Sequence, residues 1–90
     1  MRVRRRFVIT GRVQGVGFRW FAHDAAAREG VDGWVRNLPD GRVEAEIEGE
    51  LDAVDRVEAA LRRGPAASRV EDVNVDERTP VGRRTGFSIR

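Results

Sequence analysis

The sequence has no cysteine, no lysine and no tyrosine, and the missing cysteine removes several classes of function. Without cysteine the chain forms no disulfide, has no thiolate nucleophile and offers no cysteine metal site. No apolar run is long enough to span a membrane, and the arginine-rich start lacks the apolar stretch of a secretory signal. We therefore expect a cytoplasmic protein that does not enter a membrane.

The basic charge of the chain comes entirely from arginine. Seventeen arginines stand against fifteen acidic residues, so the net charge is only +2 at pH 7. Because almost no group titrates between histidine and arginine, this small charge persists to high pH, and it does not indicate a nucleic acid partner. We expect the clusters at Arg4, Arg5 and Arg6 and at Arg83 and Arg84 to be solvated surface.

The length and composition predict one globular domain over residues 1–90. Ninety residues are enough for a single core, 40% of them are hydrophobic, and the 36% that are charged favour a water-soluble surface. No repeat, linker or low-complexity tract divides the chain.

Hydrophobic periodicity predicts five strands and two helices. Apolar residues alternate with polar ones in the strands and recur at helical spacing in the helices. The expected strands cover residues 3–13, 31–38, 43–48, 70–75 and 87–89, and the expected helices begin at Phe18 and Leu51 and end near Gly30 and Gly64. The segment LPDG (38–41) predicts a hairpin turn. Glu44, Glu46 and Glu48 alternate with the apolar residues of the third strand, and this alternation is typical of a solvated face.

This element order, β-α-β-β-α-β with a short extra strand, predicts an α+β ferredoxin-like fold. We expect a mixed, largely antiparallel sheet with both helices on one face and the third strand between the parallel first and second strands. In that topology the loop after the first strand and the end of the second lie on the same rim, roughly 10 Å apart. The segment QGVGFR (14–19) therefore faces NLPDG (37–41).

The segment QGVGFR has the features of a phosphate cradle. Gly15 and Gly17 allow positive φ angles, which turn successive backbone N–H groups toward one point. Such a nest at the start of a helix binds anions, and Arg19 adds a planar fork of donors matched to phosphate oxygens. A glycine-rich turn followed by a surface arginine is the alternative that these residues leave open.

Two familiar phosphate motifs are absent. A P-loop needs a Gly-Lys-Ser/Thr ending, which a chain without lysine does not have, and a dinucleotide fingerprint starting at Gly15 needs glycine where Trp20 stands.

Residues 14–21 partly match the central signature of RNA recognition motifs. However, Val16 stands where a stacking aromatic is needed, and the segment enters a helix instead of the third strand. A non-catalytic phosphate- or RNA-binding module is therefore the alternative function.

Other polar and aromatic residues suggest no further chemistry. His23 lies beside the apolar stripe of the first helix and has no second histidine as a partner, so we expect it at the surface. Trp20 and Trp34 are expected to be packing residues, although Trp20 could border the mouth of the cradle. The chain shows no cluster of metal ligands and no nucleophilic residue in the cradle, so we expect neither a metal nor a cofactor.

Two segments, ITGRVQGVGFR (9–19) and GWVRNLPDGRVEAEIEG (33–49), resemble the two signature segments of acylphosphatases. The resemblance implies a small metal-free hydrolase that cleaves an acyl phosphate to a carboxylate and inorganic phosphate. It also implies that Arg19 and the loop amides hold the phosphoryl group and that Asn37 positions the attacking water. The phosphate-binding residues expected from it are Gln14, Gly15, Val16, Gly17, Phe18 and Arg19.

The chemistry of the residues agrees with these roles. A carboxyl phosphate has a good leaving group, so its hydrolysis depends mainly on positioning and on stabilisation of charge. Asn37 shares parity with Val35 and should face the helices; its amide can orient water but cannot remove a proton. We expect direct attack by water without a phosphoenzyme, in a monomer that binds no nucleic acid. The alternative for Asn37 is a turn-initiating asparagine before Pro39.

Overall fold

The computed structural model describes residues 1–90 and contains five strands and two helices. Each element lies close to the range that periodicity predicts. In chain order they are β1 (Arg2–Arg12), α1 (Phe18–Glu29), β2 (Asp32–Asn37), β3 (Val43–Glu50), α2 (Leu51–Arg63), β4 (Arg69–Arg78) and β5 (Phe87–Ile89). The largest difference is in β4, which extends at its C-terminal end past the predicted 70–75 because it pairs with β1 as far as Arg78.

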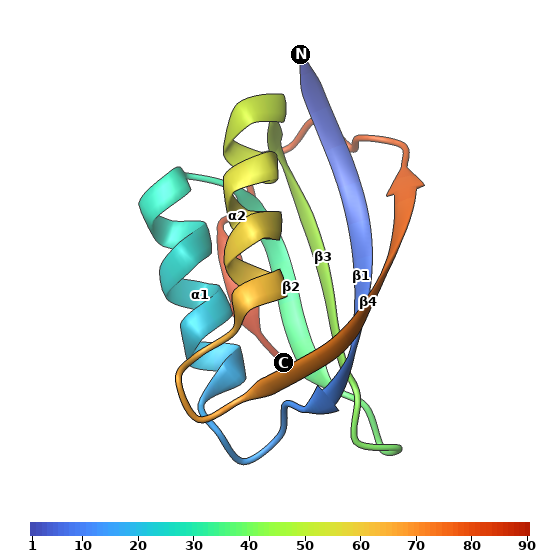
Figure 1. Ribbon diagram of the computed structural model, residues 1–90. Coiled ribbons are helices and arrows are strands. Elements are labelled where there is room, and N and C mark those ends of the chain that lie inside the picture. The colour runs from blue at the N-terminus through green and yellow to red at the C-terminus, as the bar shows by residue number, and fades with distance from the viewer.

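The five strands form one sheet in the order β4-β1-β3-β2-β5, and both helices cover the same face (Figure 1). β3 is antiparallel to β1 and to β2, so β1 and β2 run parallel to each other with β3 between them. β5 pairs in parallel with β2, which makes the sheet mixed. The predicted ferredoxin-like fold is confirmed, including the position of the inserted third strand.

The core lies between the helices and the sheet. Apolar side chains of β1, β2 and β3 face the helices at every second position, as the period of a strand requires. Fully buried members from the sheet and helices include Phe7, Ile9, Val35, Ile47, Val54 and Leu61. Phe18, also buried, begins α1 and therefore fixes the helix start against the sheet.

The opposite face of the sheet carries a ladder of ion pairs, and here the expectation of a solvated glutamate face was wrong. Glu44 and Glu48 are only 4% and 0% exposed. Arginines of β1 stand opposite the glutamates of β3, and oppositely charged residues on neighbouring strands attract. The bonds include Arg4 Nε to Glu46 at 2.5 Å, Arg4 Nη1 to Glu48 at 3.0 Å and Arg6 Nε to Glu44 at 2.6 Å.

The arginine cluster of β1 was also expected to be solvated surface, and this expectation was wrong. The side chains of Arg4, Arg5 and Arg6 are 14%, 13% and 27% exposed, and each pairs with carboxylates. Arg5 faces the helix side, where it reaches Asp55 and Glu58 of α2. Periodicity predicted which face each residue occupies, but the contacts that remove water come from elements distant in the sequence.

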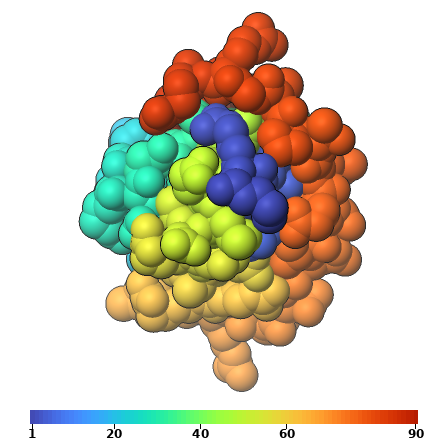
Figure 2. Space-filling model, turned by 90° about the horizontal axis from the view of Figure 1, so that it is seen from above, coloured from blue at the N-terminus to red at the C-terminus, as the bar shows by residue number.

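Two buried carboxylates of the ladder hold the segment that joins β4 to β5. Glu48 accepts hydrogen bonds from the backbone N–H groups of Val81 and Gly82, each at 2.8 Å. Asp32 accepts them from Thr85 at 3.0 Å and Gly86 at 2.8 Å. Viewed from the N-terminal end of β1, this segment lies beside the first residues of the chain (Figure 2). It thereby covers one end of the ladder.

Burial alone would raise the pKa of Glu48. The hydrogen bonds from Arg2, from the two N–H groups and from Arg4 outweigh that effect and lower the pKa to about 2. The pKa of Asp32 is also lowered: burial opposes ionisation, but the Arg2 guanidinium, the Gly86 N–H and Arg84 favour it more strongly. Both groups are therefore carboxylates at neutral pH.

Candidate active site

The loop after β1 and the turn between β2 and β3 lie at the same end of the sheet, as the topology predicts (Figure 1). Gln14 joins them directly. Its side-chain Nε2 donates to the carbonyl oxygen of Leu38 at 2.7 Å and to that of Arg42 at 3.0 Å. Leu38 directly follows Asn37, the last residue of β2, so the Gln14 amide fixes the loop against the turn that begins at the end of β2.

The loop from Gly15 to Arg19 offers unpaired backbone donors. Gly15 and Gly17 have φ angles of 72° and 78°, in the left-handed region that favours glycine. None of the backbone N–H groups of residues 15–19 donates a hydrogen bond within the protein. α1 begins at Phe18 with no side-chain cap and no acidic residue in its first turn. The N–H groups and the positive end of the helix dipole therefore remain available to an anion.

Two side chains anchor this loop to the core. Phe18 is 2% exposed and Val16 packs against the hydrophobic cluster. An added Cβ at Gly15 or Gly17 would meet no atom within 4 Å, so these glycines are required by their φ angles and not by lack of space. The loop backbone is thus held against the core by Val16 and Phe18, while the space next to Gly15 and Gly17 stays open.

Arg19 brings a positive charge to this loop. It forms no ion pair with a carboxylate, in contrast to many arginines of the sheet. Its one hydrogen bond within the protein runs from Nη1 to the carbonyl oxygen of Arg90 at 3.4 Å. Most of its guanidinium donors are therefore free to bind an oxyanion.

Asn37 ends β2 on the same side of the sheet as the loop. It stands opposite Val43 of β3, and its half-buried side chain makes no hydrogen bond within the protein. The structure brings Asn37 and Arg19 to one pocket, although they are distant in the sequence. The parity argument for its orientation toward the helices is confirmed by this position.

The pocket measures about 210 Å³ and is lined by Val13, Gly15, Gly17, Phe18, Arg19, Trp20 and Asn37. Two residues of the expected phosphate-binding set are not among its lining. Gln14 points its amide at the turn, and Val16 packs on the core. Val13 and Trp20 are additional lining residues. Val13 was missed because its place in the alternation of the predicted strand 3–13 indicates only a core residue.

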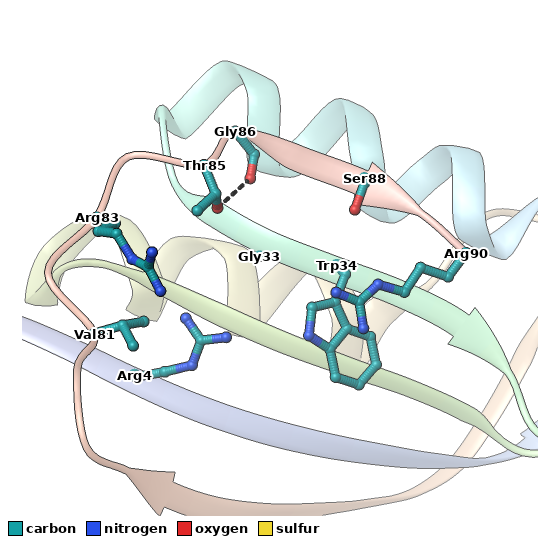
Figure 3. A pocket seen from close by; sticks show the side chains of 9 residues that line it. All are labelled: Arg4, Gly33, Trp34, Val81, Arg83, Thr85, Gly86, Ser88 and Arg90. Atoms are coloured by element: carbon teal, nitrogen blue, oxygen red, sulfur yellow. Dashed lines mark hydrogen bonds between the residues drawn. The ribbon is translucent and has the colours of Figure 1, made fainter.

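A second pocket of about 290 Å³ lies on the other face of the sheet (Figure 3). Arg4, Arg83 and Arg90 are its charged lining residues, and the Arg90 guanidinium lies 4.6 Å from the centre of the Trp34 ring. Trp34 is therefore a packing residue, as expected, and the groups that pack on its ring are the guanidinium cations of Arg36 and Arg90. None of the expected site residues lines this pocket.

The rest of the molecule adds no metal-ligand cluster and no helix that could span a membrane. No three residues among histidine, aspartate and glutamate are grouped so that they could hold a metal ion. Neither helix is both long and apolar enough to cross a bilayer.

The arrangement can hold a tetrahedral oxyanion and a water molecule side by side. The free N–H groups and Arg19 provide donors for three equatorial oxygens, which is where charge develops in phosphoryl transfer. The free amide of Asn37 can both donate and accept, so it suits a water that must be oriented for attack. No hydroxyl, thiol or amine side chain lines the pocket to act as a nucleophile.

Comparison with known proteins gives consistent matches over nearly the whole chain. A family model described as acylphosphatase matches residues 5–89. The acylphosphatase of Anaeromyxobacter dehalogenans is 55% identical over 89 residues, covering 99% of this chain and 96% of that protein. The acylphosphatase of Thermococcus kodakarensis is 49% identical over 88 residues, covering 98% and 96%. The crystal structure of Bacillus subtilis acylphosphatase has a TM-score of 0.93 at 39% identity, covering 98% of both chains.

Proposed function

Since this chain belongs to the acylphosphatase family and hydrolyses acyl phosphates, we propose that its Gly15–Arg19 loop holds the phosphoryl group and that Asn37 orients the attacking water. One observation carries this assignment. The backbone N–H groups of residues 15–19 are all unpaired within the protein, beside an arginine without an acidic partner and in the same pocket as Asn37. No comparison supports the alternative of a phosphate- or RNA-binding module.

The reaction follows from this arrangement. Water held by the Asn37 amide attacks phosphorus, the bond from phosphorus to the carboxyl oxygen breaks, and the carboxylate leaves with the electron pair. A phosphoryl oxygen of the substrate takes the proton from water, because an amide cannot act as a base. The loop N–H groups and Arg19 stabilise the charge on the equatorial oxygens. The products are a carboxylate and inorganic phosphate.

This assignment requires neither a metal nor a phosphoenzyme. The carboxylate is a good leaving group without a Lewis acid, and the pocket presents no side chain that could accept the phosphoryl group. Acid quenching during turnover should therefore find no phosphate bound covalently to the protein. A trapped phosphorylated residue would contradict direct attack by water.

The roles of Arg19 and Asn37 can be separated with Arg19→Lys and Asn37→Ala. Lysine keeps the charge but loses the planar fork, so inorganic phosphate should bind at least about 10-fold more weakly, the scale of one lost charge-assisted hydrogen bond. Asn37→Ala should leave phosphate binding nearly unchanged, while kcat falls by about 10²-fold or more, as for a lost positioned catalytic group. Phosphate affinity is measured by calorimetric titration and kcat by acyl phosphate hydrolysis.

Matched controls lie outside the pocket. Arg28→Lys repeats the arginine-to-lysine change at the far end of α1. Asn74→Ala repeats the asparagine-to-alanine change on the edge strand β4. Both should keep full activity, and circular dichroism confirms that every variant is folded. If Asn37→Ala turns over normally, or loses phosphate as completely as Arg19→Lys, the water-positioning role is wrong.

We also infer the setting in which this reaction occurs. We infer that the chain acts as a single domain and as a monomer; the loop and Asn37 come from one chain, so the site does not require a second copy. We also propose a cytoplasmic location, which the lack of cysteine supports, and no nucleic acid partner, which the small net charge of +2 supports. Analytical ultracentrifugation tests the monomer directly.

A further inference from the structure

Trp20 is an exposed aromatic residue at the phosphate pocket. It follows Arg19 on α1, lines the pocket, and is 67% exposed, in contrast to the packing role that its residue type suggests. Packing in the core therefore does not explain this side chain. A single exposed apolar residue is common on protein surfaces, so its significance depends on what holds it and what it faces.

The Trp20 ring is supported from the side by other rings. Its centroid lies 5.9 Å from that of His23, with the planes at 71°, and His23 lies 6.2 Å from Phe87 of β5 at 62°. These are edge-to-face contacts, which orient aromatic rings. His23 was expected at the surface without a role. It is instead half-buried in this row, and its Nδ1 atom makes no hydrogen bond.

The position of the phosphoryl group places the acyl group toward the mouth of the pocket. Pockets for drug-sized ligands typically measure about 300–1,000 Å³, whereas this small pocket measures about 210 Å³. With the phosphoryl group against the loop, the acyl group must extend outward past the residues at the rim. Trp20 is the large, exposed and apolar member of that lining. Simple acyl groups such as benzoyl and acetyl carry no charge beyond the phosphate, so an apolar side chain suits them.

We propose that Trp20 is the platform on which the acyl group lies and that it directs the enzyme toward aromatic acyl phosphates. This inference rests on the proposed phosphoryl site. A flat aromatic acyl group can stack on the indole face, while an acetyl group offers only one methyl. Trp20 is therefore a specificity-determining residue, separate from the groups that act on phosphorus.

Trp20→Ala should change the choice of substrate and not the chemistry. An aromatic contact of this kind corresponds to about 2- to 10-fold in binding, so kcat/KM for benzoyl phosphate should fall by about that factor. The fall should appear in KM, while kcat changes little. Activity on acetyl phosphate and competitive inhibition by inorganic phosphate should stay within about twofold. Trp20→Phe should retain most of the preference, because it keeps an aromatic face.

A binding measurement checks the same contact without turnover. Trp34→Phe leaves Trp20 as the only tryptophan of the chain, on the opposite side of the sheet from the replaced residue. In that variant, phenacylphosphonate and acetonylphosphonate are matched stable analogues of benzoyl and acetyl phosphate. Phenacylphosphonate should quench Trp20 fluorescence and bind about 2- to 10-fold more tightly than acetonylphosphonate. Trp34→Phe should itself keep the substrate preference of the unmodified protein.

Two results would overturn the assignment. If Trp20→Ala weakens both substrates and inorganic phosphate equally, Trp20 supports the cradle and does not read the acyl group. If neither substrate changes, the acyl group lies in solvent. These outcomes are distinct from failure of the proposed function, in which the unmodified protein would hydrolyse neither acyl phosphate.

Discussion

Replacing Glu48 with glutamine should weaken the fold strongly at neutral pH and only slightly in acid. Glu48 is fully buried and accepts four hydrogen bonds, from Arg2 Nε at 2.6 Å, Arg4 Nη1 at 3.0 Å and the Val81 and Gly82 N–H groups at 2.8 Å each. Glutamine has nearly the same shape but no charge. It leaves two guanidinium groups partly unpaired and presents an NH₂ group where only acceptors fit.

The magnitude follows from the pKa of the carboxyl group, which changes from 4.5 in the unfolded chain to about 2 in the fold. Since the folded value is the lower one, the stabilisation is complete above pH 4.5 and is lost as the pH falls toward 2. The difference corresponds to about 3 kcal/mol of unfolding free energy at pH 7 and about 1 kcal/mol at pH 3. Arg2 and Arg4 keep Asp32 and Glu46 as partners, so the cost should not greatly exceed this value.

Urea unfolding of both proteins, followed by circular dichroism between pH 7 and pH 3, measures this difference. The matched control is Glu50→Gln on the same strand, where the side chain is 71% exposed and pairs only with the N-terminus. Exposed pairs contribute at most about 1 kcal/mol, so the control should unfold almost like the unmodified protein at every pH. If Glu48→Gln costs no more than Glu50→Gln, or costs as much at pH 3 as at pH 7, the linkage argument is wrong.

Two further predictions concern the active site. Gln14→Leu removes both hydrogen bonds between the Gly15–Arg19 loop and the turn, so kcat should fall by up to about 10²-fold because Asn37 is misplaced. Steady-state kinetics measure kcat, and urea unfolding checks that the variant is folded. An unchanged kcat would show that Gln14 does not position Asn37. Activity should also survive dialysis against EDTA, because the proposed mechanism uses only groups of the chain. Loss of activity that Mg²⁺ or Zn²⁺ restores would contradict it.

The sequence by itself determined the order of the elements and the face of each residue. The period of two in β1, β2 and β3 and the helical stripes of α1 and α2 are local properties, and the ferredoxin-like order follows from them. The backbone of the loop over residues 15–19 was equally readable, because glycine at positions 15 and 17 predicts the left-handed conformation that both residues adopt. Asn37 could be placed opposite this loop because the topology determines which strand ends share a rim.

Only the tertiary structure decided what surrounds those residues. Glu44 and Glu48 alternate like a solvated strand face, yet they are buried, because the arginines of β1 lie across from them and the segment before β5 covers Glu48. The contact of His23 with Phe87 and the hydrogen bond from Arg19 to Arg90 likewise join residues far apart in the chain. Burial and pairing depend on such distant partners, and the spacing of residues within one segment does not predict them.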